Sequence, residues 1–177
     1  MTGANVLSSL GWQPNEPWLQ EVTLPSNLDW SRTGLNNKRS VADWAASGVT
    51  ARQGSLGPAN LQASILLPMG RNGPAFLAYP NFEVYFDWNK SFVYVTTAAY
   101  FATRLEGAQI YNAGNPSAPL SGPQMQQLQQ KLTSRGHDVG GIDGILGAKT
   151  RAAVQHEQIR LGLPADAWPT LDLLNQL

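Results

Sequence analysis

The sequence predicts an α+β fold that is mostly helical, with a short β hairpin in its first part and a bundle of three helices at its end. Two observations lead to this prediction. Apolar residues recur at helical spacing in several segments, and a glycine follows most of these segments. Two apolar runs, residues 62–67 and 75–79, flank a loop rich in glycine and proline, which is typical of a hairpin.

Three helices are expected in the first part of the chain, at residues 4–10, 41–47 and 91–105. Gly11 and Gly48 follow the first two helices, and glycine is a common residue just past a helix end. Ser40 and Asp43 have the spacing of a capping box at the start of the second helix. The stretch between these two helices is rich in proline, so we expect a loop there, and it carries Trp12, Trp18 and Trp30.

The remainder of the chain is expected to form a linker at residues 107–121 and a small domain at residues 122–177. The linker holds Gly, Asn, Pro and Ser with little periodicity. The domain is expected to contain three helices. The first presents Met125, Leu128 and Leu132 and ends at Gly136, and the others cover residues 148–160 and 168–177. A domain of this size is close to the lower limit for independent folding.

Composition excludes several classes of function. Lys and Arg together number 12, and so do Asp and Glu, so the basic excess expected of a nucleic-acid-binding protein is missing. No apolar run reaches the ~20 residues of a membrane helix. The first residues resemble no signal peptide. Six Trp and five Tyr in a weakly charged chain favour a carbohydrate surface, because flat aromatic faces pack on the C–H faces of sugars.

The last segment combines a Leu128-Gln129 helix with Asp143, Gly144, Gly147 and Thr150 at fixed spacing. It resembles the peptidoglycan-binding domain found at the ends of many wall hydrolases, a three-helix fold. We expect Asp143 to accept backbone N–H bonds, both glycines to allow positive φ or close backbone approach, and Thr150 to bond back to the turn. The resemblance implies that wall lies in a groove beside this turn. A purely structural role for all four residues stays open.

Two residues depart from that family's pattern. Glu157 stands where the family usually has an aromatic residue, and His137 stands where it usually has Tyr. A charge at a core position is costly unless it is solvated or paired, so we expect Glu157 to reach water or a partner.

The first part, residues 1–106, contains the runs 5–12, 14–25 and 40–44 and, most specifically, Tyr79-Pro80-Asn81-Phe82 followed by Trp88-Asn89, Ser91 and Tyr94. These runs resemble the B-type membrane-bound lytic murein transglycosylases and their soluble relatives. The resemblance implies a lysozyme-like transglycosylase remnant located in the periplasm or cell envelope. It implies no cofactor, and it implies glycan strands and stem peptides of peptidoglycan as partners.

The resemblance also implies the substrate-binding residues. Trp88 and Tyr94 are expected to line the sugar groove, and Asn89 to hold the substrate or a neighbouring side chain by its amide. In the alternative interpretation, Trp88 fills the core and Asn89 caps the following helix. Phe82 is expected to be a core residue.

By the same resemblance, the catalytic glutamate belongs to a Glu-Ser motif upstream of Met1, and this chain has no Glu-Ser dipeptide. In that family, one carboxylic acid with a raised pKa protonates the glycosidic oxygen, and intramolecular attack gives a 1,6-anhydro end. We therefore expect no catalytic residue here and no activity from the chain alone. We also expect the first part to associate with the missing N-terminal part or with itself.

Other motifs are interpreted as structural. His137 and His156, even with Asp138 or Glu157, match no zinc spacing, so no metal is expected. The run from Tyr111 to Gly114 resembles a groove motif of another transglycosylase family by chance. Residues 166–169 echo the earlier Asp-Gly turn, with Ala167 in place of glycine.

Two alternatives stay open. The chain is either part of a transglycosylase or a stand-alone wall-binding adaptor or decoy. A third interpretation is a glycosidase with carboxylates not yet placed, such as Glu83 and Asp87, although these are expected to be a solvated pair.

Overall fold

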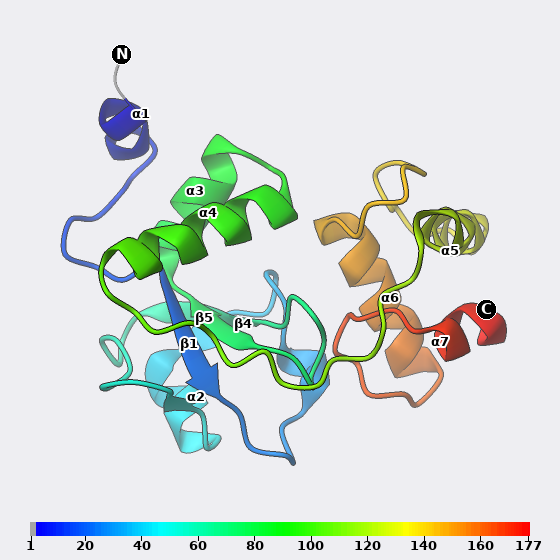
Figure 1. Cartoon of the computed structure of the whole chain (residues 1–177), viewed down its shortest axis with the longest axis horizontal. Coiled ribbons are helices and arrows are strands. Elements are labelled where there is room, and N and C mark those ends of the chain that lie inside the picture. The colour runs from blue at the N-terminus through cyan, green and yellow to red at the C-terminus, as the bar shows by residue number, and fades with distance from the viewer. Residues whose placement is uncertain (1–2) are drawn as a thin grey trace. The chain divides into compact units, whose positions relative to one another are not determined.

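The computed structural model describes residues 3–177 (Figure 1). Met1 and Thr2, which belong to the segment compared with a signal peptide, lie outside the described residues. The chain divides into two compact units, which are described separately. Unit 1 comprises residues 1–28, 35–66 and 75–112, and unit 2 comprises residues 29–34, 67–74 and 113–177. None of the helices within residues 3–177 combines the length and apolarity needed to cross a membrane.

Unit 1 contains a five-stranded antiparallel sheet with the order β2-β4-β5-β1-β3. The strands are β1 Leu19–Thr23, β2 Arg39–Ser40, β3 Thr50–Ala51, β4 Gln62–Leu66 and β5 Ala75–Ala78. The predicted hairpin is confirmed as β4 and β5, with Ile65 opposite Leu77. The hairpin is only part of the sheet. Strand β1 lies in the stretch predicted as loop, because its five residues LQEVT give too short a pattern to separate from the prolines around them.

Four helices belong to unit 1: α1 Gly3–Ser9, α2 Val41–Ala46, α3 Pro80–Trp88 and α4 Phe92–Leu105. Helices α1, α2 and α4 agree with the predictions. The Ser40 hydroxyl accepts a hydrogen bond from the amide of Asp43 at the start of α2. Helix α3 was not predicted. Pro80 occupies its first turn, where a missing N–H costs nothing.

A buried amide ties the start of α3 to the segment after α1. Asn81 has no exposed surface. Its Nδ2 donates to the carbonyls of Gln13 and Glu16 at 2.8 and 2.9 Å, and its Oδ1 accepts from the amide of Gln13 at 2.8 Å. Beside it, Phe82 is fully buried, as predicted for a core residue. The Tyr79-Pro80-Asn81-Phe82 run therefore builds the core and fixes the direction of α3.

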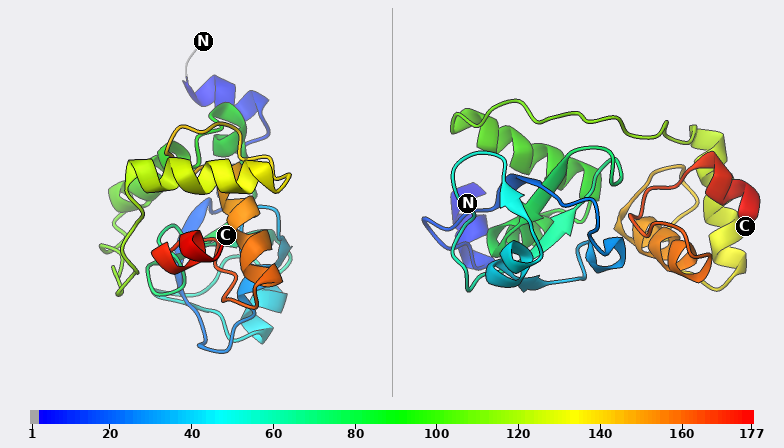
Figure 2. Two further views of the ribbon diagram at one scale, coloured as in Figure 1. Left: turned by 90° about the vertical axis from the view of Figure 1, so that its right-hand side faces the viewer. Right: turned by 90° about the horizontal axis from the view of Figure 1, so that it is seen from below.

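Unit 2 contains a 3-10 turn, Trp30–Arg32, and three helices, α5 Gly122–Ser134, α6 Ala148–Arg160 and α7 Leu171–Gln176, seen from two further sides in Figure 2. The three predicted helices are confirmed. Helix α7 begins later than predicted because the Thr170 hydroxyl caps it, accepting from the amide of Leu173. The core of the bundle is apolar and includes Met125, Leu128, Leu132, Val139, Ala153, Val154, Leu173 and Leu174.

Two side chains of α6 hold loop segments within unit 2. Arg151 is half-buried and donates to the carbonyls of Leu67 and Pro68 at 3.2 and 2.7 Å. Gln155 donates to two carbonyls of residues 29–34 at 3.2 and 3.0 Å. Burial lowers the pKa of Arg151 to about 10, which leaves the guanidinium charged at neutral pH. These bonds explain why both loop segments cluster with the three helices.

Candidate functional site

The predicted groove residues lie at the junction of α3 and α4 in unit 1. Trp88 is the last residue of α3, and Tyr94 lies in the first turn of α4. Their ring centroids are 6.0 Å apart, with the planes tilted by 52°. Each residue is 50% exposed, so Trp88 does not fill the core. The two rings form a surface that we call the aromatic pair, and such a surface can stack on sugars.

Asn89 lies between the two rings in sequence. It is the C-cap of α3, and its amide N–H donates to the carbonyl of Tyr85. Its side-chain Oδ1 accepts from the amide of Ser91 at 2.9 Å. The N-cap of α4 is Ser91, whose hydroxyl accepts from the amide of Tyr94, so the interpretation of Asn89 as that cap is wrong. Within residues 3–177, the Asn89 Nδ2 has no hydrogen-bond partner and can donate to a ligand.

The surroundings of the aromatic pair are solvated and partly apolar. Asp87 and Lys90 form an exposed ion pair at 2.5 Å. Glu83 pairs with Lys38 at 2.7 Å, so the two carboxylates face different cations. Further along α4, large apolar side chains are exposed, namely Val93, Phe101 and Leu105. This surface offers sugar-stacking groups and no paired carboxylic acids.

In unit 2, the predicted Asp-Gly turn is held by one buried side chain, Gln129 of α5. Its Nε2 donates to Asp143 Oδ1 at 3.1 Å and to the carbonyl of Ile145 at 3.1 Å. Its Oε1 accepts from the amide of Gly144 at 2.9 Å. The Nε2 also lies 3.3 Å from Thr150 Oγ1. Gln129 stood within the Leu-Gln pattern of the sequence, but its role as the clamp of the turn was not predicted.

The four predicted turn residues have different roles. Asp143 Oδ1 accepts from the amide of Ile145 at 2.9 Å, and this bond, with that from Gln129, holds the pKa of Asp143 below its usual range. Gly144 has φ +78°, as expected. Gly147 has an ordinary φ of −82° and open space where a Cβ would stand, so the expectation for it is wrong. Thr150 is fully buried and donates to the carbonyl of Val139 at 3.2 Å.

A second turn in unit 2 repeats this arrangement. Gln158 of α6 donates from Nε2 to Asp166 Oδ1 at 3.0 Å and to the carbonyl of Trp168 at 3.1 Å. Its Oε1 accepts from the amide of Ala167 at 2.9 Å. The amide of Trp168 donates to Asp166 Oδ1 at 3.1 Å. The sequence echo at residues 166–169 is therefore a structural repeat of the first turn.

The two residues that depart from the family pattern contact each other. His137 Nε2 lies 2.7 Å from Glu157 Oε1, and the Arg160 Nε donates to Glu157 Oε2 at 2.7 Å. Arg135 lies 3.9 Å from the same oxygen. Burial alone would raise the pKa of Glu157, but the hydrogen bonds and these charges hold it below its usual range. The buried carboxylate is thus paired, as expected.

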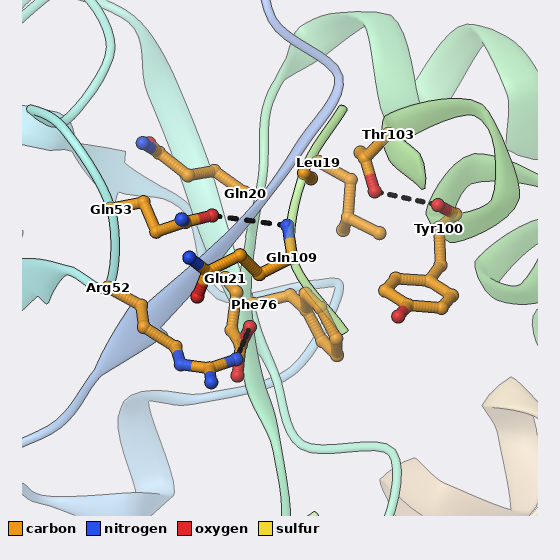
Figure 3. A pocket seen from close by; sticks show the side chains of 10 residues that line it. Leu19, Gln20, Glu21, Arg52, Gln53, Phe76, Tyr100, Thr103 and Gln109 are labelled. Carbon is orange, nitrogen blue, oxygen red and sulfur yellow. Dashed lines mark hydrogen bonds and ion pairs between the residues drawn. The ribbon is translucent and has the colours of Figure 1, made fainter. Parts of the chain in front are cut away.

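Figure 3 shows a cavity of about 160 Å³ in unit 1. Its polar side chains bond to the protein itself. Glu21 binds Arg52 at 2.6 Å and accepts from the amide of Asn112 at 2.8 Å. The Gln53 side chain accepts from the amide of Gln109 at 3.2 Å. The cavity lies where residues 108–112 pack beside β1. The bonds of its polar groups hold this segment in place.

Tyr111, the first residue of the Tyr111–Gly114 run, takes part in the same packing. The Tyr111 ring meets Tyr100 and Phe76 edge-on, with centroids 5.2 and 6.5 Å away. Tyr111 therefore has a packing role in unit 1.

Comparisons with known proteins agree with this geometry. The model of the transglycosylase SLT domain family matches residues 1–103, and that of the peptidoglycan binding domain family matches residues 121–177. Two crystal structures of SltB3 from Pseudomonas aeruginosa are similar to the chain, one in complex with NAG-anhNAM-pentapeptide and one with NAG-NAM-pentapeptide. Each shows 38% identity and a TM-score of 0.79, and the match covers 98% of this chain and 48% of SltB3. No curated protein matches the chain.

The fold and these matches define a protein that joins a lytic transglycosylase domain to a C-terminal peptidoglycan-binding domain. The chain belongs to the transglycosylase SLT-domain family, and both resemblances seen in the sequence are confirmed. It spans about half the length of SltB3.

Proposed function

We propose that this chain binds peptidoglycan in the cell envelope and that it has no transglycosylase activity by itself. The exposed aromatic pair at the α3–α4 junction is the observation that carries the proposal. A weakly charged chain with two exposed aromatic rings beside an available amide suits a neutral sugar strand. The complexes of SltB3 with NAG-anhNAM-pentapeptide and NAG-NAM-pentapeptide support a muropeptide as the ligand.

Each residue of the aromatic pair has a defined task in this proposal. The Trp88 and Tyr94 rings pack on the C–H faces of neighbouring sugars, and the Asn89 Nδ2 donates to a hydroxyl or to an acetamido carbonyl. The Asn89 Oδ1 is engaged by Ser91, so the orientation of the amide is fixed before a ligand arrives. Such preorganisation lowers the entropy lost on binding.

The C-terminal three-helix region supplies a second wall-binding surface in this proposal. The first Gln-clamped turn holds a rim on which Ile142 and Ile145 are exposed. Asp143, Gly144 and Thr150 engage groups inside the turn, so they shape this rim while the exposed apolar side chains meet the wall. A rigid turn with an apolar rim suits contact with a glycan strand or a stem peptide.

The proposed lack of activity rests on the glutamates. A general acid for glycosidic cleavage needs a carboxyl group that stays protonated near neutral pH. Glu21, Glu83 and Glu157 are each in an ion pair with a cation, and for Glu157 the hydrogen bonds and charges around it hold the pKa below its usual range. None of the chain's five glutamates precedes a serine, the motif that the family resemblance implies for the acid.

Incubation of the purified chain with insoluble peptidoglycan sacculi tests the proposal. We expect the chain to sediment with the sacculi and to release no 1,6-anhydro-muropeptides. The double variant Trp88→Ala/Tyr94→Ala should bind about 5- to 150-fold more weakly, since aromatic contacts of this kind supply about 1–3 kcal/mol together. Phe101→Ala is the matched control, because Phe101 is also an exposed aromatic residue of α4 and lies outside the pair.

Two outcomes would contradict the proposal. Release of anhydro products by the chain alone would show that it contains a catalytic carboxylate. Equal loss of binding in Phe101→Ala and in the double variant would show that general surface hydrophobicity, not the aromatic pair, causes retention on the wall.

A further inference from the structure

Both histidines of the chain meet at one place on unit 2. His137 follows α5, and His156 lies on α6, and their ring centroids are 5.1 Å apart in an edge-to-face arrangement. Glu157, the next residue of α6, has its Oε1 2.7 Å from His137 Nε2. One ligand-capable atom from each of these three residues lies within 4.8 Å of the other two. Three donors therefore surround a volume that one ion can fill.

We propose that His137, His156 and Glu157 form a binding site for a zinc-class divalent transition-metal ion. Two imidazole nitrogens and one carboxylate oxygen form a donor set that suits Zn²⁺, and imidazole selects against Mg²⁺. Zn²⁺ holds such ligands at ~2.0–2.2 Å, so small side-chain rotations bring all three atoms to one centre. The chain contains no cysteine and no other histidine, so imidazole ligands come together only here.

The carboxylate is already oriented for this role. Arg160 donates to Glu157 Oε2 at 2.7 Å, and Arg135 lies near the same oxygen, so Oε1 is the atom that faces the imidazoles. Hydrogen bonds of this kind commonly fix a ligating carboxylate. The two positive charges also repel a divalent ion. We therefore expect micromolar affinity, weaker than that of a closed structural zinc site.

One side of the site is open to water. Glu157 is buried and His137 is half-buried, while His156 is exposed on the solvent side. Three protein ligands with water in the fourth position is a known coordination of Zn²⁺. In this arrangement the ion would lie between His137 Nε2 and Glu157 Oε1, and the imidazole tautomer that carries its N–H at Nδ1 presents Nε2 to the ion.

The bound ion adds a further link between the segment after α5 and α6, which the His137–Glu157 contact already joins. Because an ion that binds only the folded state stabilises it, Zn²⁺ should raise the unfolding temperature of unit 2. The proposal is independent of wall binding, since it uses none of the residues of the aromatic pair or of the Gln-clamped turns.

Titration of the full chain, purified without a histidine tag, with ZnCl₂ at pH 7.5 tests the site. We expect one saturable event with a 1:1 stoichiometry by calorimetry, and none with MgCl₂. Both imidazoles should shift together in NMR spectra during the zinc titration. A missing saturable event, or a shift confined to one imidazole, would overturn the proposal.

Two variants sharpen the test. His156→Gln removes an exposed ligand without disturbing the core, and it should weaken zinc binding at least about tenfold. Asp138→Asn is the matched control, because Asp138 is next to His137 but pairs with Lys149 at 2.7 Å, outside the site. Unchanged binding in His156→Gln, or an equal loss in Asp138→Asn, would show that another set of ligands holds the ion.

Discussion

The two Gln-clamped turns of unit 2 have the same hydrogen bonds but different surroundings. In the first turn, Gly144 takes the left-handed conformation at φ +78°, and in the second turn Ala167 takes it at φ +60°. Asp143 of the first turn is exposed. Asp166 of the second is buried and lies 3.6 Å from Arg71, whose amide also donates to it.

This difference shows which part of the arrangement is essential. A buried glutamine can bond to a turn wherever a helix faces one, because its amide supplies both donors and an acceptor. The glycine only removes the strain of positive φ, and the second turn tolerates that strain. The negative charge of the aspartate adds stability only where it neutralises a nearby cation. The first turn is thus left with an open rim, whereas the second is tied to a loop segment of unit 2.

Removal of the first clamp should have the largest effect. Gln129→Ala leaves the half-buried amide of Gly144 and the buried Thr150 hydroxyl short of partners, which should destabilise unit 2 by about 3 kcal/mol. Urea unfolding followed by NMR signals of α5 and α6 measures this loss. Gln130→Ala, at the exposed neighbouring position, should change stability by less than about 0.5 kcal/mol. Equal effects would show that the clamp contributes nothing specific.

Neutralising the aspartate should reduce stability more in the second turn than in the first. Asp166→Asn removes the countercharge of Arg71 and of the half-buried Arg151, and it should cost about 2 kcal/mol. Asp143→Asn keeps an oxygen that accepts the same N–H bonds, and it should cost less than about 0.5 kcal/mol. Thermal unfolding of both variants makes the comparison. A larger loss in Asp143→Asn would reverse our account of the two environments.

The residues at positive φ should respond in opposite directions. Gly144→Ala places a Cβ 3.1 Å from the carbonyl oxygen of Gly122 and imposes left-handed strain, so we expect a loss of about 1–2 kcal/mol. Ala167→Gly relieves the same strain and should stabilise unit 2 by about 0.5 kcal/mol, since the greater flexibility of glycine in the unfolded chain offsets part of the gain. Chemical denaturation of both variants tests the signs, and two changes of the same sign would contradict the explanation.

The smallest predicted effect is a loss of stability at low pH. It should affect the loop near the first turn more than the second turn. Because the folded-state pKa of Glu157 is lowered, its pairing stabilises the protein above its ordinary value of 4.5. That stability is lost as the pH falls through the lowered folded-state value. Amide hydrogen exchange between pH 6 and 3 should show opening near His137 before the turn at Ala167. Glu157→Gln should abolish this pH-dependent opening. An exchange profile that stays unchanged in this variant would contradict the role of Glu157.

The predictability of the candidate site differs between its parts. The aromatic pair was found from a run of residues close together in sequence, and its exposure follows from the local ends of α3 and α4. Asn81 lay in the same run, but its bonds reach residues 65–68 positions away, so its structural role could not be inferred. The clamp of the first turn was missed for a similar reason, because Gln129 and Asp143 are 14 positions apart.

The sequence by itself determined six of the seven α-helices within residues 3–177, the β4–β5 hairpin and the family. Caps and stops such as Ser40, Gly11 and Gly48 act through bonds within a few residues, so helix ends could be predicted from them. Only the tertiary structure decided the five-stranded sheet, the two Gln clamps and the meeting of His137, His156 and Glu157. These features depend on segments distant in sequence, and the packing that brings such segments together leaves no periodic signal in either one.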